Sequence, residues 1–177
     1  MVCSAPDLVS RLDRASVLPS KGREFNGAIQ MTQKAPIPLE DFRVGQSAEI
    51  TRLVDDETVQ AFANVSGDHN PLHLDEDFAR RTPYRGRIAH GALIASYLSA
   101  LLGNELPGPG SIFVSMDLGF RSPVRIGDTV RSRAEVTSID LKTRMIELAC
   151  SCKVGDTEVM TARASVMVRT RKRKTVE

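Results

Sequence analysis

The second half of the chain alternates apolar and polar residues with a period of two, which is typical of half-buried β-strands. Turn-forming segments separate the alternating stretches, so each stretch is predicted to be one strand. These predicted strands span residues 111–120, 128–139, 144–153 and 158–169. Residues 48–53 alternate in the same way and predict a further strand. Because several connections have the length of hairpin loops, we expect antiparallel pairing.

The most apolar segment precedes these four strands, at residues 88–103. Its apolar residues are not confined to one stripe, and Gly103 stands where a helix would end. We therefore expect a helix that is buried on nearly every side and is too short to span a membrane. A membrane is accordingly not an expected partner. Inward-facing strand residues would cover this helix, namely Val130, Ala134, Val136, Ile146, Leu148, Met160, Ala162 and Val166.

Two shorter helices are predicted before it. The acidic residues 55–57 favour a helix N-terminus, and Val59 and Phe62 then fall on one face of that helix. Asp75 is expected to cap another short helix. One buried helix combined with antiparallel strands makes an α+β domain.

Length and composition agree with one domain. The chain has 177 residues, of which 41% are hydrophobic and 26% charged, which suffices for one proper core. We assign this domain to residues 36–169, and disorder is the simplest account of the extension at residues 1–35. The formal net charge is +2, and residues 170–177 form a basic tail. Because the body of the chain is not basic, nucleic acid is not an expected partner, and charge runs of this kind are usually solvated.

The cysteines indicate a reducing compartment. There are three, an odd number, and Cys150 and Cys152 alternate on one face of a predicted strand. Small core residues are the expected role, without a disulfide framework. Residues 1–35 show no secretory signal, and their acidic residues make a poor transit peptide. We expect a cytoplasmic protein, with the mitochondrial matrix as the alternative.

The segment 66–73 carries the most informative chemistry. Asp68 and His73 are five residues apart and cannot share one helical face, so they are expected in an ordered loop. Gly67 can end a helix, and Pro71 favours an extended residue before it, so Asp68 and His73 can converge on one point. A carboxylate and an imidazole that converge can activate a water molecule. The alternative is an ordinary Asx-turn aspartate beside a half-buried histidine.

A second candidate group opens the apolar helix at His90 and Gly91. A helix N-terminus presents free N–H groups and partial positive charge, which favours a ligand's carbonyl oxygen. Gly91 would let that ligand approach the backbone. The alternative is that Gly91 only allows close packing and that Ser96 and Ser99 bond back to helix carbonyls.

Metal and nucleotide cofactors are not expected. His69, His73 and His90 are the only histidines, and no thiolate or second carboxylate cluster accompanies them at zinc-site spacing. The chain also has no glycine-rich nucleotide loop.

At these residues the sequence resembles a known family, the (R)-specific enoyl-CoA hydratases or MaoC-like dehydratases. The residues that carry the resemblance are Phe62, Val65, Ser66-Gly67-Asp68, Asn70-Pro71-Leu72-His73 and Ala79. It continues through His90-Gly91, the following helix, Phe120, Pro123-Val124 and Gly127-Asp128, and covers roughly residues 38–169.

The resemblance implies a hot dog fold, in which an antiparallel sheet wraps around a central helix, and a homodimer. It implies that Asp68 and His73 are the catalytic pair, that the Gly91 N–H polarises a thioester carbonyl, and that Ser99 supports Asp68. Asn70 and His90 are expected to be supporting residues. The implied reaction adds water reversibly to trans-2-enoyl thioesters of coenzyme A or acyl carrier protein, without a cofactor. Family members often have methionine or valine at the position of Ala92, which bears on acyl-chain preference.

Other activities remain open at this point because one fold hosts several functions. The first alternative is a 3-hydroxyacyl-ACP dehydratase of fatty-acid synthesis. The second is an acyl-CoA thioesterase, although a hydrolase needs only one carboxylate to position water, whereas the pair of Asp68 and His73 suits addition across a double bond. The third is a non-catalytic module that binds acyl thioesters.

Overall fold

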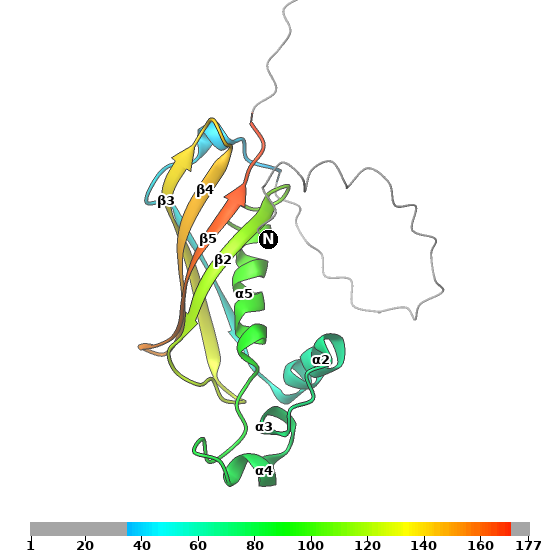
Figure 1. Cartoon of the computed structure of the whole chain (residues 1–177). Coiled ribbons are helices and arrows are strands. Elements are labelled where there is room, and N and C mark those ends of the chain that lie inside the picture. Colours follow the sequence, from blue (N-terminus) through cyan, green and yellow to red (C-terminus); the bar gives the residue numbers. More distant parts are fainter. Residues whose placement is uncertain (1–34, 171–177) are drawn as a thin grey trace, which may run out of the picture. The chain divides into compact units, whose positions relative to one another are not determined.

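Five antiparallel strands form a single sheet in the order β1-β3-β4-β5-β2 in the computed structural model, which describes residues 35–170 (Figure 1). Their bounds are β1 Ser47–Leu53, β2 Ile112–Phe120, β3 Thr129–Asp140, β4 Met145–Val154 and β5 Thr157–Met167. All five predicted strands are confirmed to within a few residues. The order places β2 beside β5, at the edge of the sheet.

Helix α5, Gly91–Asn104, lies along one face of this sheet (Figure 1). Its buried side chains are Leu93, Ile94, Tyr97, Leu98, Leu101 and Leu102. All eight strand residues that were predicted to cover the helix are buried. This is the α+β hot dog arrangement, so the predicted fold class is confirmed.

One expectation about α5 is wrong. The helix is not buried on nearly every side, because Ala92, Ser96, Ser99 and Gly103 are exposed. The sheet covers only one side of the helix, and among residues 35–170 nothing of comparable size covers the opposite side. The residues on that opposite side are small, which distinguishes them from the leucines that face the sheet.

Short helices connect β1 to α5. They are α2 Asp56–Ser66, α3 Pro71–Leu74 and α4 Glu76–Arg80, and a 3-10 turn, η1 Leu39–Asp41, precedes β1. The side chains of Asp55 and Asp75 cap α2 and α4, as predicted, by accepting bonds from Thr58 N at 2.8 Å and Phe78 N at 2.9 Å. Gly67 ends α2 with a φ of 78°.

The segment 66–73 is not a loop throughout, which corrects the sequence-based expectation. Asp68 lies in a loop, but His73 lies inside α3. The reason is local, since Asn70 caps α3 by accepting a bond from Leu72 N at 3.0 Å and Pro71 occupies the first helical turn.

The two cysteines of β4 are core residues. Cys150 and Cys152 are buried and free, as predicted, and Cys152 Sγ lies 3.2 Å from Ser132 Oγ. Burial raises the pKa of the Cys150 thiol to about 12. Between residues 35 and 170 no helix is long and apolar enough to cross a membrane. The expected extension at 1–35 and the basic tail at 170–177 lie outside the described residues, apart from the single residues that border them.

Candidate active site

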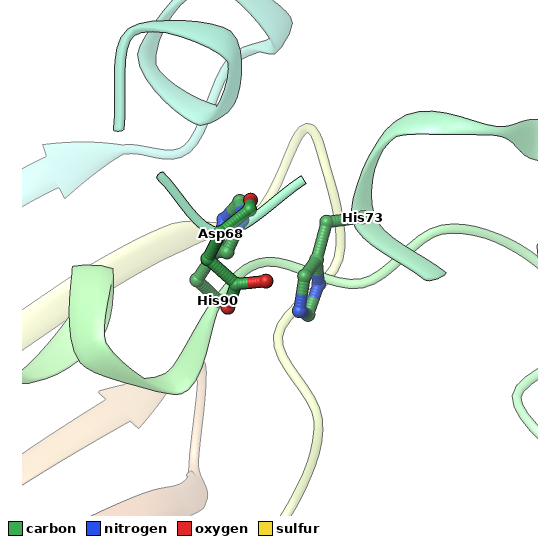
Figure 2. A group of neighbouring side chains, drawn as sticks. All are labelled: Asp68, His73 and His90. Atoms are coloured by element: carbon green, nitrogen blue, oxygen red, sulfur yellow. The ribbon is translucent and has the colours of Figure 1, made fainter. Parts of the chain in front are cut away.

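Asp68 follows the C-terminal end of α2, where the positive φ of Gly67 turns the chain away from the helix. Its Oδ1 accepts a hydrogen bond from Asn70 N at 3.2 Å, which forms an Asx turn. The carboxylate nevertheless points toward the ring of His73 (Figure 2). The turn-forming role and the chemical role that the sequence suggested are therefore compatible in one residue.

His73 presents one defined nitrogen to this carboxylate. Its side chain is buried, and its Nδ1 lies 2.8 Å from the carbonyl oxygen of Ile88. Because a carbonyl only accepts, the hydrogen bond assigns the proton of the neutral ring to Nδ1. Nε2 then carries the lone pair. The partner that determines this tautomer is a backbone atom, for which the sequence holds no signal.

The structure brings the two candidate groups together. Asp68, His73 and His90 each offer one nitrogen or oxygen atom, and these three atoms lie within 4.8 Å of one another. A water molecule that hydrogen-bonds two acceptors at about 2.8 Å each bridges a gap of this size. Asp68 and the His73 ring can thus hold one water between them.

His90 lies behind this pair at the N-cap of α5 (Figure 2). Its Nε2 is 3.0 Å from the backbone oxygen of Asp68, and its ring stacks on that of His73 with centroids 3.9 Å apart. Burial is the main cause that lowers the pKa of His90 below its usual value, although the hydrogen bond to Asp68 opposes this. The ring is therefore neutral at physiological pH.

The N-terminus of α5 offers free donors beside His73. His90 makes no side-chain capping bond, and within residues 35–170 no acceptor is found for the N–H groups of Gly91 and Ala92. Such groups carry the partial positive charge of the helix. A Cβ on Gly91 would lie 2.7 Å from Cζ of Phe120, so any larger residue would require the ring of Phe120 to move. The sequence match contained Phe120 but assigned it no role.

A cavity of about 350 Å³ opens at this point. Its wall is largely apolar and includes His73, Gly91, Ile94, Phe120, Val124 and Val159. Arg121 also lines it, and its guanidinium donates to Thr161 Oγ1 at 3.0 Å. A site of this size and lining accommodates a small apolar group beside a few polar ones.

Of the expected supporting residues, Asn70 lies at the site and Ser99 lies away from it. Asn70 caps α3 and so orients the helix that carries His73. Ser99 lies eight residues beyond Gly91, about 12 Å along the helix axis. Its side chain is exposed and makes no hydrogen bond to Asp68 in the described part of the chain. Ser96 bonds back to Leu93 O at 2.6 Å, as the alternative for the serines predicted.

A metal ion is the other occupant that the cluster of Asp68, His73 and His90 permits by distance. Two of the four ring nitrogens face backbone carbonyls and carry protons, which removes them as ligands. The remaining nitrogen of His90, Nδ1, is buried. The metal-free site stays a prediction.

Comparison with known protein families identifies the family of this chain. Residues 34–158 match the family model described as a MaoC like domain, which is well over half of the chain. The chain belongs to the MaoC-like family. A 3-hydroxybutyryl-CoA dehydratase of Methylorubrum extorquens is 46% identical over 130 residues, covering 73% of this chain and 83% of that relative. An (R)-specific enoyl-CoA hydratase of Rhodospirillum rubrum is 42% identical over 130 residues, covering 73% and 90%.

Solved structures of (R)-hydratases agree with this assignment. An (R)-hydratase from A. caviae involved in PHA biosynthesis superimposes with a TM-score of 0.71 at 38% identity, covering 73% of this chain and 98% of that one. An R-hydratase from Pseudomonas aeruginosa in the unliganded form gives a TM-score of 0.73 at 36% identity, with 77% and 88% covered. The family expected from the sequence motifs is therefore confirmed.

Proposed function

We propose that this MaoC-like protein is an (R)-specific enoyl-CoA hydratase, a hydro-lyase that reversibly adds water to trans-2-enoyl thioesters and forms (R)-3-hydroxyacyl thioesters. The observation that carries the proposal is the position of Asp68 and His73 within 4.8 Å of each other, beside the free N–H groups that open α5. The names of the relatives from Methylorubrum and Rhodospirillum support the same reaction.

The geometry defines a mechanism. Asp68 and His73 hold one water, and one of them accepts its proton as the oxygen attacks C3 of the enoyl thioester. The π electrons of the double bond move toward the carbonyl and give an enolate. The N–H of Gly91 donates a hydrogen bond to the thioester carbonyl oxygen, where the negative charge of the enolate develops. A proton is then delivered to C2, which completes the addition and restores the site. The reverse sequence dehydrates the 3-hydroxyacyl thioester.

The first prediction is the effect of the two catalytic substitutions on hydration of crotonyl-CoA. Asp68→Asn and His73→Ala should each lower kcat by roughly 10²- to 10⁴-fold, because each removes a proton-transfer partner. Loss of the conjugated-enoyl absorbance measures the rate, and chiral analysis should identify the (R) product. Asp77→Asn, on the exposed surface of α4, is the matched control and should retain the wild-type rate.

Three outcomes would replace the proposal. Near-normal rates in Asp68→Asn would remove the assigned role of that residue. Release of free thiol from acyl-CoA would identify a thioesterase, in which water attacks the carbonyl carbon. Binding without turnover, on coenzyme A and acyl carrier protein thioesters of several lengths, would identify a non-catalytic module.

The acyl carrier protein alternative has one observation in its favour. A mitochondrial 3-hydroxyacyl-[acyl-carrier-protein] dehydratase of Arabidopsis thaliana is 40% identical, but over only 88 residues. The relatives named for coenzyme A substrates match longer stretches at higher identity. Coenzyme A is therefore the favoured carrier of the acyl group. Free, buried Cys150 and Cys152 support a reducing compartment, for which we propose the cytoplasm, with the mitochondrial matrix as the alternative.

A homodimer is the proposed assembly. Strand β2 is an edge strand, and Ile112, Phe113, Val114 and Phe120 are its exposed large hydrophobic residues. Exposed apolar edge strands pair readily with another strand. Antiparallel pairing of two β2 strands is compatible with a twofold axis and would extend the sheet across both chains. The small exposed residues Ser96 and Ser99 of α5 would allow the second chain to approach closely.

A further inference from the structure

His90 contacts or adjoins all three parts of the proposed site, which are Asp68, His73 and the N-terminus of α5. Its side chain is 1% exposed, and it directly precedes Gly91. It is the N-cap residue of α5, but its side chain makes no capping hydrogen bond to the helix. The ring instead contacts the loop of Asp68 on one side and the ring of His73 on another (Figure 2).

The contact with Asp68 requires a proton on Nε2 of His90. This atom lies 3.0 Å from the backbone oxygen of Asp68, and a carbonyl oxygen can only accept. Nδ1 of His90 is buried and has no partner among the described residues, so the neutral ring keeps its lone pair there. The donated bond fixes the backbone of the residue whose carboxylate points toward His73.

The contact with His73 is a ring stack. The two ring centroids are 3.9 Å apart at an interplanar angle of 34°, and the ring of Phe62 packs against His90 with centroids 5.1 Å apart. His73 is thereby held between two constraints, the hydrogen bond from its Nδ1 to Ile88 O and the face of His90. Both constraints orient its Nε2 toward Asp68.

The charge state of His90 is important for this arrangement. The titratable groups that face it are Asp68, His69 and His73. Burial lowers its pKa, and the two neighbouring histidines lower it further, whereas Asp68 raises it. A neutral ring can stack on His73 without placing a positive charge beside the group that must exchange a proton.

We propose that His90 is a positioning residue of the hydration reaction, which acts as a neutral Nε2–H imidazole by holding the Asp68 backbone through its hydrogen bond and the His73 ring through its stack. This inference rests on the proposed function. The role is distinct from contacting the substrate and from capping α5. His90 does not itself exchange a proton with the substrate.

The kinetic test uses two substitutions that separate the two contacts. His90→Phe keeps an aromatic ring for the stack but loses the donor, and His90→Gln keeps an N–H donor but loses the ring. We expect kcat on crotonyl-CoA to fall by about 100-fold in His90→Phe, while KM changes by no more than a few-fold. A small displacement of catalytic groups lowers reaction rates by about this factor. His90→Gln should recover part of the lost kcat. Asp77→Asn, on the exposed surface of α4, is again the control that should keep the wild-type kcat.

Several kinetic results would overturn the proposal. Wild-type kcat in both variants would exclude a positioning role, and so would an effect on KM alone. Circular dichroism and thermal melting should show that both variants fold. If His90→Phe does not fold, the kcat of His90→Gln decides alone. A fully active Gln variant, which has no ring at position 90, would contradict the need for the stack.

A spectroscopic measurement on the intact protein tests the proposal independently of turnover. The chain has only three histidines, so their ring nitrogen signals can be assigned by single substitutions in ¹⁵N NMR. We expect a neutral His90 with its proton on Nε2 near neutral pH, and slow exchange of that proton with water. A charged ring, or a proton on Nδ1, would overturn the proposal even if the protein hydrates enoyl thioesters. Absence of turnover with the expected NMR signature would instead overturn the proposed function.

Discussion

Individual residues in this protein combine a local structural role with a chemical one. Asp68 forms an Asx turn through one carboxylate oxygen while its carboxyl group faces His73. His73 is buried in α3, yet its tautomer leaves Nε2 available to the site. At this scale a substitution tests a single contact, and two positions, His90 and Gly91, have clear expected outcomes.

The lowered pKa of His90 predicts a pH-dependent stability. In the folded protein His90 stays neutral below its usual pKa of 6.5, whereas the unfolded chain protonates it there. Below that pH the unfolded state binds more protons, so the free energy of unfolding rises with pH; the contribution is complete above about 6.5 and lost as the pH falls. Urea midpoints between about pH 7.5 and 5.5 measure this.

The control for that prediction is His90→Phe, which should make the midpoint less dependent on pH in the same window. The lowered pKa values of Asp55, Glu76 and Asp140 act in the same direction but belong to carboxyl groups that titrate at lower pH. An unchanged pH dependence in the variant would show that His90 is not the group responsible.

Gly91→Ala should lower activity without unfolding the protein. The new Cβ would lie 2.7 Å from Phe120 Cζ, and the ring, which is 55% exposed, can move to relieve the clash. The moved ring would alter the cavity beside the helix N-terminus, so kcat/KM should fall by roughly 10²-fold, as for a disturbed oxyanion donor. Steady-state kinetics with crotonyl-CoA measures the loss.

Two further variants make that prediction specific. Phe120→Leu combined with Gly91→Ala should recover part of the activity, because the smaller side chain leaves space for the methyl group. Gly103→Ala lies on the same helix, and a Cβ there meets no atom within 4 Å, so it should remain active. Equal losses at Gly91 and Gly103 would contradict the steric explanation.

At the scale of elements, three short helices build the site around the N-terminus of α5. Arg87 connects two of them, because its Nη1 lies 2.7 Å from Asp56 of α2 and its Nε 3.6 Å from Glu76 of α4. The residue after Arg87 supplies the carbonyl that orients His73. The position of His73 therefore depends on how α3 is capped and how its neighbours are held together.

The cap of α3 yields an element-scale prediction. Asn70→Ala removes the side-chain oxygen that accepts from Leu72 N and should lower the free energy of unfolding by about 1 kcal/mol. Because α3 carries His73, kcat should fall as well. Asn70→Ser retains a capping oxygen and should be more stable and more active than the alanine variant. Urea unfolding and kinetics on both proteins measure this, and indistinguishable variants would contradict it.

At the scale of the whole molecule, the exposed edge of the sheet predicts association. Light scattering coupled to size-exclusion chromatography should give twice the mass of one chain. Val114→Lys places a charge on exposed β2 and should shift the mass to that of a monomer, because edge lysines disfavour strand pairing. Leu141→Lys replaces a residue that is 60% exposed and follows β3, and should leave the dimer intact. A monomeric wild type would contradict the proposed assembly.

The sequence by itself determined the strands, most of the helices and the family, since these depend on neighbours along the chain; the short helix α3 was the exception. Period-two alternation predicted every strand, capping aspartates predicted two helices, and the motif around Asp68 and His73 predicted the family. These signals are local, because side-chain periodicity and capping are properties of a few consecutive residues.

Only the tertiary structure decided which distant groups meet. The carbonyl of Ile88 that fixes the His73 tautomer, the ring of Phe120 over Gly91 and the stack of His73 on His90 join residues from different elements. The exposure of one side of α5 likewise depends on the sheet packing against only the other side. Such contacts arise when elements pack, and neither a backbone carbonyl nor the edge of a sheet is encoded by the identity of a single residue.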